Sequence, residues 1–332
     1  MNHSQPPAKW LLLLLFLITP LLTPVRGFGC GEPNDPCPPT FTDGIYYKFG
    51  LNLGDAGRTH RFAIFTYGGG TSSSPFSALE VSATTSTTLF GYQIMGDIGM
   101  AGAYSRLTVS GYGSVSGDRY SRTTSTEVRV GPNAVIGGTR YSSSSIDSAA
   151  LAAITALKNV STTAAGFAST AGSPTNIAMT GGSISFSNNP FRGKYVMNLS
   201  NLTLTNGAVL TLNGAAGTAF VINVSGSFSL TNSSQIVLSG GLTTSDVLFN
   251  IKGNSGTFQI TGNSLFQGTL LAYNSATNGT QRTLTIDGSN TLLRGEVIAN
   301  RVVVTNGARV RIPPRASCDD DRDEDRRGQE RD

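Results

Sequence analysis

The sequence predicts an all-β fold, a right-handed β-solenoid (β-helix) with one α-helix alongside or capping the stack. Three observations predict it. A pattern of strand, small polar turn and strand recurs between residues 194 and 311, its period is about 22 to 30 residues, and Asn-Gly, Gly-Asn, Asp-Gly or Ser-Gly pairs bound the strands. A repeat of this length can bury its apolar side only against neighbouring coils, so we expect the repeats to stack.

The repeats contain two kinds of segment. Segments of the first kind alternate apolar and polar residues around a turn: LTLTNGAVLTLNG (202–214), FSLTNSSQIVLSG (228–240), FQITGNSLFQG (258–268), LTIDGSNTLLRG (284–295) and VVVTNGARVRI (302–312). A second recurring strand lies between them: FVINVSG from Phe220, VLFNIKG from Val247, TLLAYNS from Thr269 and EVIANRV from Glu296.

The alternation also predicts where side chains point. Residues such as Leu202 and Leu204 should face a narrow interior, leaving Thr, Ser and Asn outside. Gly and Asn suit the corners because they tolerate positive φ better than other residues. We expect Phe220 and Leu248 to point inward on adjacent coils.

Residues 1–27 read as a signal peptide. Lys9 precedes an apolar run from Trp10 to Leu22, and small residues follow it. The run is interrupted by Pro20 and is shorter than the roughly 20 apolar residues of a membrane-spanning helix. We therefore expect a secreted protein, extracellular or at the cell surface, with no stable membrane span in the mature chain.

Composition favours one elongated domain. Gly accounts for 40 of 332 residues, apolar residues for 39% and charged residues for only 13%, which suits a thin continuous core. The net charge of +4 comes from scattered basic residues, so nucleic acid is not an expected partner. The expected organisation is a signal peptide (1–27), a Cys/Pro-rich segment (28–44), the solenoid domain (45–312) and a charged, disordered tail (313–332).

The cysteines fit export to an oxidising environment. Cys30 and Cys37 bracket the Pro-rich loop GEPNDP, and we predict a disulfide between them. Cys318 is left over, and it would be an exposed thiol or would join two chains, so self-association is a further expectation. Because no Cys or His cluster and no calcium repeat occurs, no metal site and no cofactor are predicted.

The region before the regular repeats holds less regular strands and one helix. Strands are expected around Phe49 to Phe65, and earlier coils at 92–100 and 128–136, with a surface loop from Gly68 to Ser77. A helix should open at Ser144, with an apolar stripe through Ile146, Ala150, Leu151, Ile154 and Leu157. It could lie along the solenoid wall or cover an open end. Residues 160–182 are expected to be a loop.

Several segments carry a resemblance to known families. Residues 149–157 (AALAAITAL), FVINVSG, SDVLFNI, FQGTLLA and LRGEVIANRV resemble the choice-of-anchor A domain, a bacterial adhesive domain, across most of residues 45–312. The segment LNLGDAGRTHRFAI (51–64), then MGDIG (95–99), a helix and the repeated turns are similar to the ice-binding β-solenoid family. Neither resemblance supplies catalytic residues.

Three classes of function compete. The leading expectation is an adhesive or structural module that binds an extended surface, a glycan or a matrix polymer. The first alternative is ice binding, which needs outward Thr in register over several coils. Thr203 and Thr205 have counterparts in Thr283 and Thr285, but Ser227, Ser229, Gln259 and Thr261 intervene, so the ladder is expected to be broken.

The second alternative is a polysaccharide-active β-helix enzyme, and the residues give it little support. His60 is the single histidine after the predicted signal peptide, and a structural role is its default reading. Asp246, Asp287 and Glu296 are separated by whole repeats and suit corner or surface positions, although the fold could still pair two of them in a groove. No catalytic residues are therefore assigned, and the protein is not expected to be an enzyme.

Overall fold

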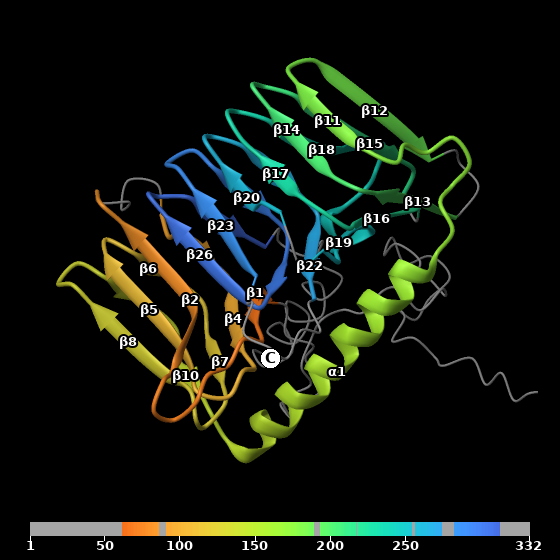
Figure 1. The fold of residues 1–332 in the computed structure, drawn as a ribbon. Helices are drawn as coiled ribbons and strands as arrows, with labels where there is room; N and C mark the ends of the chain where they lie inside the picture. Colours follow the sequence, from red (N-terminus) through yellow and green to blue (C-terminus); the bar gives the residue numbers. More distant parts are fainter. Residues whose placement is uncertain are drawn as a thin grey trace, which may run out of the picture.

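The computed structural model describes residues 62–85, 91–188, 193–216, 218–253, 256–273 and 282–312. The predicted signal peptide, the segment 28–44 with Cys30 and Cys37, His60, and the tail 313–332 with Cys318 lie outside these residues. The described chain forms three parallel sheets of nine strands each around a common core, with a helix beside them (Figure 1). The predicted β-solenoid with one accompanying α-helix is confirmed.

Each coil contributes one strand to each sheet. Sheet A contains, in spatial order, β10 (Arg140–Tyr141), β7 (Arg119–Ser121), β4 (Asp97–Met100), β1 (Phe62–Thr66), β25 (Val297–Ala299), β22 (Thr269–Ala272), β19 (Val247–Ile251), β16 (Ala219–Val224) and β13 (Lys194–Leu199). Sheet B contains β11 (Ile177–Thr180), β14 (Leu202–Thr205), β17 (Phe228–Leu230), β20 (Phe258–Thr261), β23 (Thr283–Asp287), β26 (Arg301–Thr305), β2 (Phe76–Ala83), β5 (Ser105–Gly111) and β8 (Thr126–Val130). Sheet C contains β12 (Ser183–Asn188), β15 (Val209–Gly214), β18 (Gln235–Ser239), β21 (Leu265–Gln267), β24 (Leu292–Arg294), β27 (Arg309–Arg311), β3 (Ile94–Met95), β6 (Ser114–Val115) and β9 (Val135–Ile136).

The core follows from the alternation in the sequence. In β14, Leu202 and Leu204 are buried while Thr203 and Thr205 are only partly covered, as a strand with one face on the core requires. Stacking of coils brings like residues together, and the ring of Phe228 lies 6.0 Å from that of Phe258 on the next strand of sheet B. Edge-to-face contacts of this kind add to the gain from burying the rings.

The corners between sheets B and C use the predicted turn residues. Asn206 and Asn306 adopt φ values of 53° and 52°, each followed by a Gly with positive φ. This left-handed conformation is costly for most side chains and is tolerated by Asn and Gly. The Asn-Gly pairs therefore fix where each coil bends.

The stacking order of the coils does not follow the chain. The last coil of the sequence pairs with the first described one, since Ile64 pairs with Val297, Leu79 with Val302 and Ile94 with Val310. The solenoid is thus assembled from two segments, β1 to β10 and β11 to β27, that meet in its middle. The coils expected at 92–100 and 128–136 are present as β3, β4, β8 and β9. They come early in the sequence, yet in space they lie beyond the last repeat, because β3 pairs with β27.

Helix α1 (Ser144–Gly166) connects the two segments by running along sheet A, from the β10 end of the stack to the β13 end (Figure 1). Its start matches the prediction, because the Ser143 hydroxyl accepts a hydrogen bond from the Ile146 amide and caps the helix. Of the two expected placements, the structure shows the helix on the wall.

Two details of the helix prediction were wrong. The helix continues to Gly166 instead of ending before residue 160, because Val160, Ser161 and Ala164 are buried against sheet A. Leu151 was placed in the apolar stripe, yet 51% of its surface is exposed. The contact stripe keeps Ile146, Ala150 and Leu157 from the prediction and continues through Val160 and Ala164.

The inward assignment of Leu248 was also wrong. Phe220 does face the core, but it pairs with Val247, so Leu248 lies beside Val221 on the opposite face of sheet A. Leu248 is still buried because it packs in the cluster under α1. Sheet A is covered on both faces, and its apolar runs therefore lack the alternation that reveals direction.

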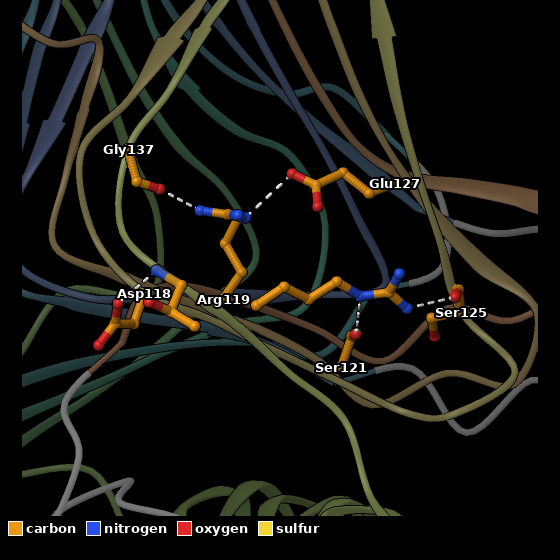
Figure 2. Close-up of polar contacts among 8 residues, drawn as sticks. Asp118, Arg119, Ser121, Ser125, Glu127 and Gly137 are labelled. Atoms are coloured by element: carbon orange, nitrogen blue, oxygen red, sulfur yellow. Dashed lines mark hydrogen bonds and ion pairs between the residues drawn. The ribbon is translucent and has the colours of Figure 1, made fainter.

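One end of the stack carries charged residues that point toward the interior. At the β8, β9 and β10 end, charged residues replace the inward apolar column: Arg119 Nε lies 3.0 Å from Glu127 Oε1, and Arg140 donates hydrogen bonds to Ser121 Oγ (3.0 Å) and the Ser125 carbonyl (2.6 Å) (Figure 2). Arg119 stands next to Ile98 of the preceding coil, so an inward arginine replaces the apolar residue at this position of sheet A. Inward charges are a known protection against pairing of an edge with another chain.

Candidate functional site

The outer face of sheet A is unavailable for a ligand because α1 covers it. Below the end of the helix, Asn198, Asn223 and Asn250 stand in register on adjacent strands and are joined by side-chain hydrogen bonds of 2.8 Å. Asn250 also donates to the Ser161 carbonyl at 2.9 Å and accepts from the Ser161 hydroxyl at 2.7 Å. These amides satisfy buried polar groups and attach the helix to the sheet.

The outer face of sheet C is mixed apolar and basic. Val209, Leu265 and Leu292 are partly exposed on it, and Arg294, Arg309 and Arg311 project from the neighbouring strands β24 and β27. Burial and the positive charge of Arg311 lower the pKa of Arg309. This face has no continuous row of one side-chain type.

Sheet B presents two columns of outward residues. From one end to the other, the first column is Ala178, Thr203, Ser229, Gln259, Thr285, Val303, Glu80, Thr108 and Val128. The second column is Thr180, Thr205, Thr231, Thr261, Asp287, Thr305, Ser82, Ser110 and Val130. Thr231 follows Leu230 and Ser82 follows Val81, so both continue the register of the paired residue before them.

The second column is the most regular surface on the described strands. Seven of its nine residues are Thr or Ser. Neighbouring members are separated by the distance between strands, about 4.8 Å, and the two columns by two residues along a strand, about 6.6 Å. The backbone thus holds hydroxyl and methyl groups on a fixed two-dimensional grid.

The Glu80 and Asp287 carboxylates on sheet B both have polar partners. Arg301 and Glu80 form an ion pair of 2.6 Å. The Asp287 carboxylate accepts hydrogen bonds from the Thr305 hydroxyl at 2.6 Å and from the Asn306 amide at 2.7 Å. Asp287 is the one charged residue in the second column.

The predicted ladder was incorrectly registered. Thr203 stands in one column with Ser229, Gln259 and Thr285, whereas Thr283, its expected counterpart, stands beside Arg301 in a separate column. Both columns are interrupted: Gln259 stands in the first, and Asp287 stands between Thr261 and Thr305 in the second. The ladder prediction missed Thr180, Thr231, Thr305, Ser82 and Ser110.

A sequence signal for most of the second column does exist. Its threonines stand directly before the corner, in Thr180-Gly-Gly, Thr205-Asn-Gly, Thr231-Asn-Ser, Thr261-Gly-Asn and Thr305-Asn-Gly. Aligning the repeats on their turns rather than on their strands would have identified these five residues.

The acidic residues considered for catalysis are not gathered at one site. Asp287 lies on sheet B, whereas Asp246 and Glu296 precede β19 and β25, two strands of sheet A that are separated by β22. The Asp246 carboxylate accepts hydrogen bonds from the Thr243 amide and hydroxyl at 2.6 and 2.7 Å, which is a corner role. Within the described ranges, no three His, Cys, Asp or Glu residues lie close enough together to hold a metal.

No helix in the described part of the chain combines the length and apolarity that a bilayer span requires. Helix α1 is the long one, and its polar outer residues face away from the sheet.

Comparison with solved structures found several similar folds. An ice-binding protein from an Arctic yeast is 18% identical, with a TM-score of 0.44 over 82% of this chain and 98% of that one. An ice-binding protein from the Antarctic ascomycete Antarctomyces psychrotrophicus is 18% identical, with a TM-score of 0.42 over 80% and 99%. A domain of an ice-binding protein from Shewanella frigidimarina is 16% identical, with a TM-score of 0.42 over 75% and 92%. A search of curated protein sequences found no match.

A family model described as Ice-binding-like matches residues 79–310, which is more than half of the chain. The match supports the resemblance to ice-binding β-solenoids, whereas the choice-of-anchor A resemblance is not shown by any comparison. It also overturns the leading expectation of an adhesive module for glycans or matrix polymers, in favour of the ice-binding alternative. The chain belongs to the Ice-binding-like family.

Proposed function

We propose that this protein binds ice through the outer face of sheet B. The observation that carries the proposal is the second column, in which threonines and serines stand in register on most coils of a continuous parallel sheet. Membership of the Ice-binding-like family supports it. The activity is binding without catalysis.

The physical argument concerns periodicity. An ice surface is an array of water molecules that repeats in two dimensions, and a ligand for it must repeat as well. Parallel strands repeat at about 4.8 Å. Each threonine offers a hydroxyl that can join the water network and a methyl group that favours ordered water beside it. Because the groups sit on one rigid body, many weak contacts act together.

The neighbouring sheets are less suitable for this role. Sheet A is covered by α1, and its outward residues include Val221, Leu248 and Leu271, which are buried in that contact. Sheet C carries exposed arginine in place of a hydroxyl column. Long charged side chains hold their own hydration water and move between rotamers, so they fit a lattice poorly.

The test changes the shape of the face without changing the fold. Thr205→Tyr and Thr261→Tyr, made together, place two bulky rings in the second column, and we expect loss of thermal hysteresis and of incorporation into growing ice. The matched control is Thr211→Tyr, which makes the same change at a partly exposed, outward position of sheet C. All variants should unfold within about 0.5 kcal/mol of the wild type.

Two results would refute the proposal. Wild-type protein that neither produces thermal hysteresis nor enters ice would exclude ice binding. A loss of activity in Thr211→Tyr equal to that in the double variant would exclude sheet B as the specific face.

We further propose that the protein acts outside the cell. Ice that threatens a cell forms first in the surrounding water, and the apolar run from Trp10 to Leu22 fits a signal peptide. The N-terminal sequence of the protein recovered from the medium tests this, since export without cleavage near residue 27 would contradict it.

A further inference from the structure

Sheet C has a feature that ice binding does not use. The described strands of this sheet contain no Asp or Glu, and their charged residues are Arg294 on β24 and Arg309 and Arg311 on β27. Arg294 pairs directly with Arg311, and Arg309 stands two residues from Arg311 on the same face. We call these three residues the arginine patch.

The arginine patch concentrates like charges at close range. Neighbouring strands are about 4.8 Å apart, and residues two apart on a strand are about 6.6 Å apart. Arg294 is exposed, and Arg309 and Arg311 are partly buried, so the guanidinium groups are accessible but incompletely hydrated. Three neighbouring guanidinium groups favour a partner with several carboxylates, because each guanidinium can form bidentate hydrogen bonds with a carboxylate.

The chain itself contains such a partner. Residues 319–325 read DDDRDED, with six acidic residues and one arginine, hence a net charge of −5. We propose that this acidic segment binds the arginine patch on sheet C of the same molecule.

The connection between the two is short. Strand β27, which carries Arg309 and Arg311, ends one residue before Ile312, and the acidic segment begins at Asp319. The six intervening residues can span at most about 20 Å, several strand spacings. A tether of this length keeps the acidic segment at a high effective concentration near the patch. The interaction depends on opposite charges at close range.

The binding would cover sheet C and leave sheet B open. It would also neutralise the positive face of a protein whose overall net charge is +4. The inference stands apart from ice binding, since it concerns a different sheet and is measured without ice.

The experiment uses the complete mature chain with Cys30→Ser and Cys37→Ser, so that a nitroxide spin label attaches to Cys318 alone. Paramagnetic broadening of backbone amide signals then reports which face the label approaches. Arg311 lies within reach of the label in every variant, because six residues separate it from Cys318, so the reporters are amides around Leu265, two strands away on sheet C, where we expect broadening. Amides of Thr205 and Thr261 on sheet B serve as the internal reference and should stay sharp.

The charge requirement is tested from both sides. The variant R294Q/R309Q/R311Q should lose the sheet C broadening, whereas R129Q/K158Q/K252Q, which removes the same charge from exposed positions elsewhere, should retain it. Asp→Asn changes at residues 319, 320, 321 and 323 remove most of the negative charge of the acidic segment and should abolish the effect. In 1 M salt, where the screening length falls to about 3 Å, the broadening should also disappear.

Three outcomes would overturn the proposal. One is equal or absent broadening on sheets B and C in low salt. The second is persistence of the sheet C signal after the Asp→Asn changes. The third is equally strong broadening on sheet C in a mixture of spin-labelled, isotopically unlabelled protein with label-free, isotopically enriched protein, which would assign the contact to a second copy of the chain.

Discussion

Sheets A and B are built on the same core with the same strand spacing, yet one is covered by a helix and the other is open. Their inward residues are equivalent, for example Ile222 and Leu204, both fully buried. Their outward residues differ: sheet A presents Val221, Leu248, Leu271 and a row of asparagines, and sheet B presents threonines and serines. The solenoid backbone therefore fixes the spacing of groups on a face, and the type of outward residue determines what that face can bind.

The largest effect should come from placing a charge under the helix. Leu271 is fully buried between sheet A and α1, so Leu271→Asp should destabilise the protein by about 3 kcal/mol or more, from lost packing and an unpaired charge. Thr285→Asp makes the matched change on the outward face of sheet B, beside Gln259, and should cost less than about 1 kcal/mol.

Urea unfolding of both variants measures the difference. If Leu271→Asp and Thr285→Asp unfolded at the same urea concentration, the distinction between a covered and an open sheet would be wrong.

A smaller effect is expected from the asparagine row. Asn250→Ala removes the amide that bonds to Asn223 and to Ser161 of α1, and it leaves buried partners unsatisfied, which should cost about 1 to 3 kcal/mol. Gln259→Ala on sheet B removes a 3.2 Å bond to the Ser229 hydroxyl that water can replace, so its cost should stay below that of Asn250→Ala.

Hydrogen exchange in α1 separates the two cases further. Asn250→Ala should speed exchange near Ser161, and Gln259→Ala should leave the helix amides as they are. Unchanged helix protection in Asn250→Ala would mean that the asparagines do not hold the helix on the sheet.

The smallest effect concerns the start of the helix and depends on pH. Partial burial raises the pKa of Asp147, but hydrogen bonds from the Thr123 hydroxyl (2.6 Å) and amide (2.8 Å), with the charge of Arg122, outweigh it and set the pKa below the usual 3.8. A carboxylate with a lowered folded-state pKa stabilises the fold above its unfolded-state pKa and loses that contribution as pH falls through the folded-state value.

Asp147→Asn should therefore be slightly less stable than wild type at neutral pH, by less than about 1 kcal/mol because solvent screens this partly exposed group. The difference should vanish in strong acid, below pH 3.8. Thermal melts at several pH values check this, and a gap between the two proteins that grows toward acid would contradict the assigned sign.

Local sequence patterns specify the inward residues and the bends of each coil. Alternation in segments such as LTLTNG sets which residues face inward, and Asn or Gly sets where the chain bends, because both are local properties of two to four residues. The helix start was equally local, since it depends on the Ser143 cap. The threonines of the second column were also present in the sequence, in a fixed position before each corner.

The order of the coils and the face that remains open depend on contacts between distant parts of the chain, so only the tertiary structure shows them. The stack joins residues that are 221 positions apart, such as Glu80 and Arg301, and no local pattern specifies that pairing. The tertiary structure also places Leu248 on the α1 side of sheet A. The sequence did not indicate this direction, because strands buried on both faces lack the alternation of apolar and polar residues. The register that aligns Thr180, Thr205 and Thr261 follows from backbone hydrogen bonds between successive coils, so the grid of sheet B exists only once the stack has formed.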